Sequence, residues 1–367
     1  MRRTLTALVL AGCGHSPAVR DATPRDGSSD DAAVPRRLVA YSGGYGPDIA
    51  WYAVGGDGTL TATSSIAAFA PSPSFLAIRR TTLFAVSEAN SKVGAYAIDP
   101  TTAALTFINS VDSAGSGPAF VGIDRAGNYA LVANYDGGTV AALAIRADGG
   151  LTAGTPVAVG KNAHMILTDP SNHFAFVPCL GSDYVAQLTF DPATGALAPN
   201  AVPHFATAAG AGPRHLAFAP DGVHVYLLAE TASTLSALTL DPASGQLAEL
   251  QTTSTRAAGA TGANTGAEVW VHPSGKFVYT SNRGDDNIAV FTIGADAHVT
   301  LAGHVATGMT PRDFTLDPDG THLYAANQNG GTITQYAIDA QSGMPAAIGA
   351  PLAIAMPSFV AVVDLAP

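Results

Sequence analysis

The sequence predicts an all-β fold, a seven-bladed β-propeller whose ring is closed by a C-terminal strand that completes the first blade. Three observations lead to this prediction. The composition is rich in turn-forming residues, a unit of 44 to 53 residues recurs along the chain, and the first and last units are incomplete in complementary ways.

The composition favours a turn-rich β protein. The 367 residues include 39 glycines and 24 prolines, and 47% of the residues are apolar but only 12% are charged, against about 25% in an average soluble domain. A disordered chain has few apolar residues, so this chain is expected to fold. No apolar run reaches the roughly 18 residues of a membrane-spanning helix. The formal net charge of -11 and the lack of a basic block argue against a nucleic-acid partner.

The N-terminal residues resemble a lipoprotein-type signal peptide. Residues 1–13, MRRTLTALVLAGC, place two arginines before an apolar stretch and small residues before Cys13. The end of this segment resembles a lipobox, in which Cys13 would be the lipidation site. We therefore expect an exported lipoprotein of the cell envelope, whose membrane contact is only through an N-terminal lipid anchor. The alternative is an ordinary exported or cytoplasmic protein.

Residues 14–37 are polar, rich in Pro, Ser and Asp, and have no apolar periodicity, so they are expected to form a disordered tether. The propeller is then expected to occupy residues 38–367. If Cys13 is lipidated, Cys179 has no disulfide partner, and we expect it to be a small buried hydrophobe.

The repeat accounts for the number of blades. Each unit begins with a six-residue strand, and the third residues of these strands are separated by 45, 44, 51, 53, 45 and 46 positions. Four short strands per unit at this period are typical of a β-propeller blade. The expected first strands are Pro73–Ile78, Pro118–Ile123, Asn162–Leu167, Pro213–Phe218, Gly266–Val271, Pro311–Leu316 and Pro357–Val362.

The two incomplete units predict how the ring closes. The last unit ends after one strand, whereas the first unit, from Leu38, begins at its second strand. The C-terminal strand therefore completes the first blade, which removes the exposed sheet edges of an open array. A pair of β-sandwiches would not explain these matched ends.

One mouth of the channel is expected to be polar on one side. The first strand of each blade lines the channel, and its third residues are Phe75, Phe120, His164, His215, Glu268, Asp313 and Phe359. Ionisable groups thus replace phenylalanine in four consecutive blades. The second strands end at the same mouth, where alignment to the third strands gives Gly44, Glu88, Tyr135, Leu180, Glu230, Arg283 and Gln328.

A cluster of both charge signs with two histidines is a candidate site in a chain with so few charges. The residues expected there to bind substrate are His215, Glu268, Asp313, Arg312 and Gln328. The alternative is that these groups tie neighbouring blades together by buried ion pairs and hydrogen bonds.

Several motifs resemble those of the seven-bladed propeller lactonases, the family of the propeller-type 6-phosphogluconolactonases and the carboxy-muconate lactonizing enzymes. They are Gly212–His215 followed by Glu230, Ala267–Glu268 with His272–Pro273, Ser281–Gly284, and Pro311–Arg312. The resemblance extends from about residue 38 to the end of the chain. It implies a carboxylic ester hydrolase of carbohydrate metabolism that opens a sugar-acid-type lactone.

The resemblance also implies four catalytic residues, His164, Arg214, Glu230 and Arg283. Either Glu230 or His164 could be the base that activates water, and the other could protonate the ring oxygen. The two arginines would hold an anionic group or the oxyanion. We expect a monomer that acts on a small-molecule lactone with no cofactor and no metal ion.

Two questions stay open on the sequence. An exported protein favours an unphosphorylated or carboxylated lactone, whereas a cytoplasmic one favours 6-phosphogluconolactone. A second class of function is a non-catalytic, membrane-tethered propeller that binds a ligand or protein partner, because the propeller fold hosts many functions.

Overall fold

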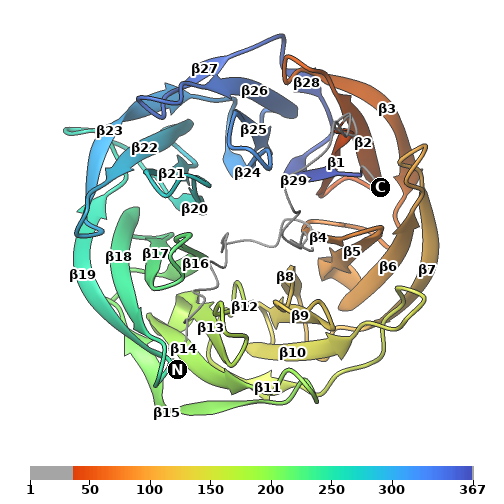
Figure 1. The fold of residues 1–367 in the computed structure, drawn as a ribbon, viewed down its shortest axis with the longest axis horizontal. Coiled ribbons are helices and arrows are strands. Elements are labelled where there is room, and N and C mark those ends of the chain that lie inside the picture. Colours follow the sequence, from red (N-terminus) through yellow and green to blue (C-terminus); the bar gives the residue numbers. More distant parts are fainter. Residues whose placement is uncertain (1–35, 366–367) are drawn as a thin grey trace, which may run out of the picture.

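The computed structural model describes residues 36–365, which form seven antiparallel sheets arranged radially around a central channel (Figure 1). This arrangement confirms the predicted seven-bladed β-propeller. The expected signal peptide, Cys13 and residues 14–35 of the expected tether lie outside the described residues. None of the helices in residues 36–365 has the length and apolar content needed to cross a membrane.

The first four blades follow the predicted order of strands from the channel outward. Blade 1 consists of β29 (Pro357–Asp364), β1 (Leu38–Gly44), β2 (Asp48–Val54) and β3 (Leu60–Ala67). Blade 2 consists of β4 (Leu76–Arg79), β5 (Thr82–Ser87), β6 (Lys92–Ile98) and β7 (Leu105–Asp112). Blade 3 consists of β8 (Pro118–Ile123), β9 (Tyr129–Asn134), β10 (Thr139–Ala144) and β11 (Val157–Ala158). Blade 4 consists of β12 (Leu167–Thr168), β13 (Phe174–Cys179), β14 (Tyr184–Phe190) and β15 (Leu197–Ala206).

The remaining three blades repeat the pattern. Blade 5 consists of β16 (Pro213–Phe218), β17 (His224–Ala229), β18 (Thr234–Asp241) and β19 (Gln246–Ser254). Blade 6 consists of β20 (Gly266–Val271), β21 (Phe277–Asn282), β22 (Asn287–Ile293) and β23 (Val299–Ala306). Blade 7 consists of β24 (Pro311–Leu316), β25 (His322–Asn327), β26 (Thr332–Ile338) and β27 (Pro345–Ala347), with β28 (Leu352–Ala353) also paired to β26. Two short 3-10 helices, η1 (Glu88–Asn90) and η2 (Leu180–Ser182), follow β5 and β13.

The C-terminal strand closes the ring as predicted. In blade 1, β29 pairs with β1 in an antiparallel register that runs from Leu38 opposite Asp364 to Gly43 opposite Phe359. The backbone N–H of Arg37, assigned to the tether from the sequence, donates to Asp364 Oδ1 at 3.2 Å. Contact with the ring therefore begins just before β1, which starts at Leu38 as expected.

A repeated tyrosine contact joins neighbouring blades. Tyr41, Tyr226, Tyr279 and Tyr324 lie on second strands, are fully buried, and each donates a hydrogen bond to a backbone carbonyl of the next blade. The distance is 2.8 Å from Tyr41 Oη to Ala103 O. Because a buried hydroxyl must find a partner, this contact fixes the rotation of one blade against the next. The mouth residues are thus carried on a rigid frame.

Two first strands are shorter than predicted. β4 begins at Leu76 instead of Pro73, and β12 contains only Leu167 and Thr168 instead of extending from Asn162. Asn162 has a positive φ of 57°, which interrupts an extended strand. His164 consequently lies in a loop, held by its N–H, which donates to Pro178 O at 3.0 Å.

Candidate functional site

One opening of the channel gathers the predicted residues, and we call it the polar mouth. It is the opening where the first strands of the blades begin and the antiparallel second strands end. Arg214 lies at the start of β16 and Arg312 at the start of β24, whereas Glu230, Arg283 and Gln328 directly follow β17, β21 and β25. The alignment made from the sequence therefore located these chain positions correctly.

A β-bulge changes the direction of the arginines. In β16, Pro213 pairs with Ala229 and His215 with Leu228, so Arg214 is an extra residue without a direct partner. The same shift occurs in β24 at Arg312, between Pro311 and Asp313. A bulge breaks the alternation of a strand and can re-aim a side chain. The bulge allows Arg214 and His215, although they are adjacent in sequence, both to point toward the channel.

Two glycines of the predicted motifs are required by the backbone. Gly212, which precedes β16, has a φ of 66°, and a Cβ atom there would lie 2.6 Å from Thr231 Oγ1. Gly284, which follows Arg283, has a φ of 152°, and a Cβ atom there would lie 2.4 Å from Ala263 O. Only glycine fits such positions readily. These turns place Arg214 and Arg283 at the mouth.

Glu230 holds Arg214 and Arg283 together. Its Oε2 lies 3.0 Å from Arg214 Nε and 2.9 Å from an Nη of Arg283. The guanidinium group of Arg214 also donates to Ala267 O, and that of Arg283 donates to Gly266 O at 3.2 Å. We call Arg214 and Arg283 the arginine pair. One carboxylate thus fixes two guanidinium groups from neighbouring blades.

The protonation of this group follows from its surroundings. Burial alone would raise the pKa of Glu230, but the charges of Arg214 and Arg283 lower it below its ordinary value. Burial lowers the pKa of Arg214 to about 10, and the charge of Arg283 adds to this effect. At neutral pH Glu230 is therefore ionised and both arginines are protonated.

The arginine pair retains hydrogen-bonding capacity. Among residues 36–365, the Nε atoms of Arg214 and Arg283 are buried and have no hydrogen-bond acceptor. Arg214 Nε is close to Glu230 Oε2, but the N–H bond is not aligned for a hydrogen bond with it. Buried donors are normally satisfied. Their lack of an acceptor is consistent with a site that receives oxygen atoms of a ligand.

Arg312 lies at the same mouth with a different neighbour. Its guanidinium carbon is 5.4 Å from the centre of the Tyr45 ring, a cation–π contact. In the described part of the chain it forms no ion pair with a carboxylate. The Tyr45 hydroxyl donates to Glu88 Oε1 at 3.2 Å, and Ser74 Oγ donates to the same oxygen at 2.5 Å.

Four ionisable residues from consecutive blades form a buried row, which we call the carboxyl–imidazole chain. His164 Nδ1 lies 3.1 Å from His215 Nε2, and His215 Nδ1 lies 2.8 Å from Glu268 Oε2. The carboxyl group of Glu268 is hydrogen-bonded to that of Asp313. The side chains of His215 and Glu268 are only 1% and 0% exposed.

Three residues that were expected to bind substrate are buried in this row. As whole residues, His215 and Glu268 are 0% exposed and Asp313 is 3% exposed, against 4% for His164. Their contact with substrate stays a prediction. Gln328 reaches the rim, where its N–H donates to Thr310 O at 2.8 Å. Its side chain makes no hydrogen bond or ion pair with the other mouth residues that the structure describes. Arg312 is the member of this set whose position suits direct contact with a ligand.

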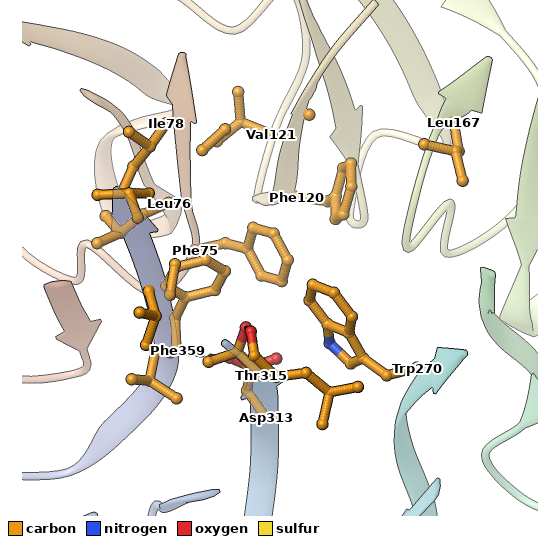
Figure 2. Close-up of a pocket in the computed structure, with 17 residues that line it drawn as sticks. Phe75, Leu76, Ile78, Phe120, Val121, Leu167, Trp270, Asp313, Thr315 and Phe359 are labelled. Atoms are coloured by element: carbon orange, nitrogen blue, oxygen red, sulfur yellow. Dashed lines mark hydrogen bonds between the residues drawn. The ribbon is translucent and has the colours of Figure 1, made fainter. Parts of the chain in front are cut away.

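Phenylalanines cover the other side of the channel, as predicted from the third residues of the first strands. The centre of the Phe75 ring is 4.6 Å from that of Phe120 and 4.5 Å from that of Phe359. Figure 2 shows these three rings together, with Trp270 facing them and Asp313 beside them. His215 packs its edge against Phe75 and Phe120, at 6.0 and 5.8 Å between ring centres.

An apolar cavity lies along the channel beside these rings. Its lining continues from Phe75 to Ile78 and from Asp313 to Leu316, toward the ends of the first strands and away from the arginine pair. None of His164, Arg214, Glu230 and Arg283 lines it. Asp313 is the one ionisable residue among the described residues that line the cavity, and the four residues just named lie at the polar mouth.

Some mouth residues were not assigned a role from the sequence. The strand alignment gave Glu88 and Tyr135 as mouth positions, but Tyr45, one residue beyond Gly44, was missed. The Tyr135 ring meets the edge of the His164 ring at 5.5 Å between centres. The signal that could have found Tyr45 is a polar aromatic residue directly after a second strand.

Two further expectations concern cysteine and metal ions. Cys179 is buried, and burial raises the pKa of its thiol to about 12, so it is a thiol at neutral pH. Residues 36–365 contain no group of three or more His, Cys, Asp or Glu side chains positioned to hold a metal ion.

Comparison with known proteins identifies relatives of this chain. The chain is 31% identical over 307 residues to the 6-phosphogluconolactonase of Bacillus subtilis, covering 78% of this chain and 87% of that protein. It is 33% identical over 230 residues to the 6-phosphogluconolactonase of Pectobacterium carotovorum, covering 62% of this chain and 68% of that protein. The structure of the periplasmic gluconolactonase of Pseudomonas aeruginosa superimposes with a TM-score of 0.82 and 26% identity, covering 90% and 99% of the two chains.

The family model for "Lactonase, 7-bladed beta-propeller" matches residues 39–362. This range includes all seven blades and every residue of the polar mouth discussed above. The chain therefore belongs to the family of seven-bladed β-propeller lactonases.

Proposed function

We propose that this protein hydrolyses the lactone ring of a sugar acid at the polar mouth. The observation that carries the proposal is the arginine pair, held by Glu230, beside the imidazole of His164. The relatives named 6-phosphogluconolactonase and gluconolactonase support this class of substrate. The alternative of a non-catalytic, membrane-tethered propeller receives no support from these relatives.

Two observations favour His164 over Glu230 as the base. Burial lowers the pKa of His164 well below its ordinary value, and the charges of the neighbouring guanidinium groups of Arg214, Arg312 and Arg283 act in the same direction. His164 is therefore neutral at pH 7 and can accept a proton. The Oε2 atom of Glu230 is already engaged by two guanidinium groups, so this oxygen is not free to take a proton from water.

The reaction then needs only groups of this chain. His164 removes a proton from water, and the hydroxide adds to the lactone carbonyl. The arginine pair stabilises the oxyanion through its buried donors, in a low-dielectric setting where such donors are most effective. The C–O bond of the ring breaks as the imidazolium returns its proton to the ring oxygen. Glu230 orients the guanidinium groups throughout.

Arg312 is proposed to select the substrate. It is a guanidinium group at the mouth without a carboxylate partner among the described residues, and guanidinium suits planar recognition of phosphate or carboxylate. A 6-phosphate or a carboxylate distant from the lactone carbonyl would be its ligand. The arginine pair would remain available for the oxyanion.

The test is an assay of the purified protein against aldonolactones with and without a 6-phosphate, followed by acid release. We expect hydrolysis of at least one of them, and Arg283→Ala to lower kcat/KM about 10²-fold because one oxyanion donor group is lost. Arg146→Ala, which removes an exposed arginine paired only with Asp148 and Leu151, is the matched control. Absence of hydrolysis throughout the panel, or full activity of Arg283→Ala, would contradict the proposal.

We also propose that the protein is exported and anchored through Cys13. The supports are the lipobox-like sequence and the relative from Pseudomonas aeruginosa that is named a periplasmic gluconolactonase. Palmitate is expected to label the wild-type protein in cells and not the Cys13→Ser variant, and globomycin is expected to block processing. Equal labelling of both would count against the anchor. Lack of labelling together with cytoplasmic fractionation would favour a phosphorylated substrate.

A further inference from the structure

The carboxyl–imidazole chain spans the polar half of the channel from blade 4 to blade 7. It connects His164 to three buried groups that come from the next three blades. The contacts are 3.1 Å between His164 Nδ1 and His215 Nε2 and 2.8 Å between His215 Nδ1 and Glu268 Oε2, followed by the hydrogen bond between the carboxyl groups of Glu268 and Asp313. A row of buried polar groups in a largely apolar protein is costly unless every member is paired. Its pairing is therefore informative about where the protons lie.

The hydrogen bond between the carboxyl groups of Glu268 and Asp313 determines the position of one proton in the chain. Two carboxyl groups can be hydrogen-bonded to each other only if one of them is protonated. Glu268 Oε1 accepts the N–H of Val269 at 2.9 Å, and Glu268 Oε2 faces His215 Nδ1. Asp313 Oδ2 accepts only the N–H of Val360, at 2.8 Å. Glu268 is thus the ionised partner, and Asp313 carries the proton that it donates to Glu268.

The imidazole tautomers follow from this assignment. The carboxylate of Glu268 requires a proton on His215 Nδ1, and in the neutral form of His215, which is the form we assign, Nε2 is an acceptor. His164 Nδ1 then donates to His215 Nε2. The remaining nitrogen of His164, Nε2, has no proton and lies on the side of the ring away from His215. A positively charged His215 would instead donate from Nε2 to His164 Nδ1 and leave the proton of His164 on its own Nε2, the result that the nitrogen-15 measurement below would detect.

We propose that His215, Glu268 and Asp313 are positioning residues that hold His164 in the tautomer with an unprotonated Nε2 at the mouth and stabilise its imidazolium during the reaction. The catalytic consequence rests on the proposed function. The tautomer itself does not, since it is a property of the protein without substrate.

Every proton that His164 takes up in this scheme is released again within the same reaction cycle. When Nε2 takes a proton from water, the Nδ1 proton of His164 strengthens its hydrogen bond to His215, and the positive charge is offset by Glu268 through the His215 ring. When the ring oxygen leaves, Nε2 gives up its proton and the chain returns to its starting state. Asp313 keeps its proton throughout, so no charge is left uncompensated in the channel.

The surroundings of the chain support the same assignment. His164 faces Arg214 and Arg312 from β16 and β24, Arg283 after β21, and the ring of Tyr135 after β9. Burial and these charges lower its pKa, so a counter-charge is needed for the imidazolium to form. Burial and Glu268 raise the pKa of Asp313 well above its ordinary value, although Arg214 acts against this.

The first test is nitrogen-15 NMR of histidine-labelled protein at pH 7, which distinguishes protonated from unprotonated ring nitrogens. We expect His164 to have a proton on Nδ1 and none on Nε2, with the resonance assigned by its loss in His164→Gln. A proton on Nε2 of the wild-type His164 would overturn the proposal. This measurement needs neither substrate nor activity.

The second test is Glu268→Gln, which keeps the size of the side chain and removes the charge. We expect kcat to fall about 10²-fold with little change in KM, within the range that proton transfer contributes. Because the imidazolium loses its counter-charge, the pKa of His164 falls and the acid limb of the rate profile moves to lower pH. A wild-type kcat together with an acid limb at the same pH as in the wild type would overturn the proposal.

Variants of Asp313 test its role as a hydrogen-bond donor to Glu268. Asp313→Leu removes the hydrogen bond to Glu268 and is expected to lower kcat about tenfold, the effect of losing one hydrogen bond to a charged group. The conservative Asp313→Asn can still donate to Glu268 and is expected to rescue most of that loss. Failure of the rescue would contradict the assignment of the proton to Asp313.

The matched control is Asp317→Asn. Asp317 directly follows β24 at the opposite end of the strand, is buried, and pairs with His322 Nδ1 at 2.9 Å. Asp317→Asn therefore replaces a carboxyl group beside a histidine by an amide, as Glu268→Gln does, but away from the mouth. We expect thermal stability to decrease without any change in the His164 tautomer or the acid limb. If the tautomer is found but no lactone is hydrolysed, the chain stands and the proposed function fails.

Discussion

Replacing Glu230 by alanine is expected to abolish lactone hydrolysis and to lower the free energy of unfolding by about 3 kcal/mol, the low end for breaking a buried ion pair. The arginines are only 3% and 11% exposed, and Glu230 is 22% exposed. Without its carboxylate, two guanidinium groups from neighbouring blades repel each other with little water to solvate them. Urea unfolding and the lactone assay measure the two effects.

The pH dependence of this contribution has a definite sign. The pKa of Glu230 is held below its ordinary value of 4.5 in the folded protein. The stabilisation is therefore present above about pH 4.5 and is lost as the pH falls through the folded pKa. In Glu230→Ala this acid component disappears.

The control for Glu230→Ala is Asp148→Ala, which breaks an exposed pair with Arg146 at 2.9 Å. Exposed pairs contribute about 0 to 1 kcal/mol, so stability and activity should both remain near those of the wild type. Equal losses of stability in the two variants would show that Glu230 does not hold the arginine pair in the way described.

Replacing His164 by glutamine is expected to lower kcat about 10³-fold, within the range for removal of a general base. The amide can still donate to His215 Nε2, so the fold should be retained, but it cannot accept a proton at neutral pH. In the wild type, the rate should be independent of pH from 6.5 to neutrality, because the pKa of His164 lies well below 6.5. The rate should decline only at lower pH.

His304→Gln is the matched control for this substitution. His304 lies on β23, where its Nε2 donates to Thr255 O at 2.9 Å, and it is not part of the mouth. Activity should be unaffected. A wild-type rate for His164→Gln would exclude His164 as the base and return Glu230 to that role.

The regular spacing of the repeated units explains why the fold could be predicted from the sequence. The spacing of residues such as Phe120 and His215 reflects a repeated four-stranded unit, and the incomplete ends required the pairing of Leu38–Gly44 with Pro357–Asp364. Residues at the ends of second strands, such as Glu230 and Arg283, could also be placed, because strand direction determines which mouth they reach.

The protonation and contact pattern of the site could not be predicted in the same way. An alternating strand would send Arg214 and His215 to opposite faces, and no residue count reveals the bulge between Pro213 and His215. The sequence also gave no sign that one Glu230 oxygen serves two arginines. The hydrogen bonds among His215, Glu268 and Asp313 depend on burial, which only the assembled ring creates.

The pairing of β29 with β1 has a consequence for the order in which the protein is made. This pairing joins the two ends of the propeller, so its chain-closure entropy is the largest of any contact in the ring. During synthesis, blades 2 to 7 can form one after another, but β1 keeps an unpaired edge until the last strand leaves the ribosome. For most of its synthesis the protein thus carries an open sheet edge, the feature that invites pairing with another chain.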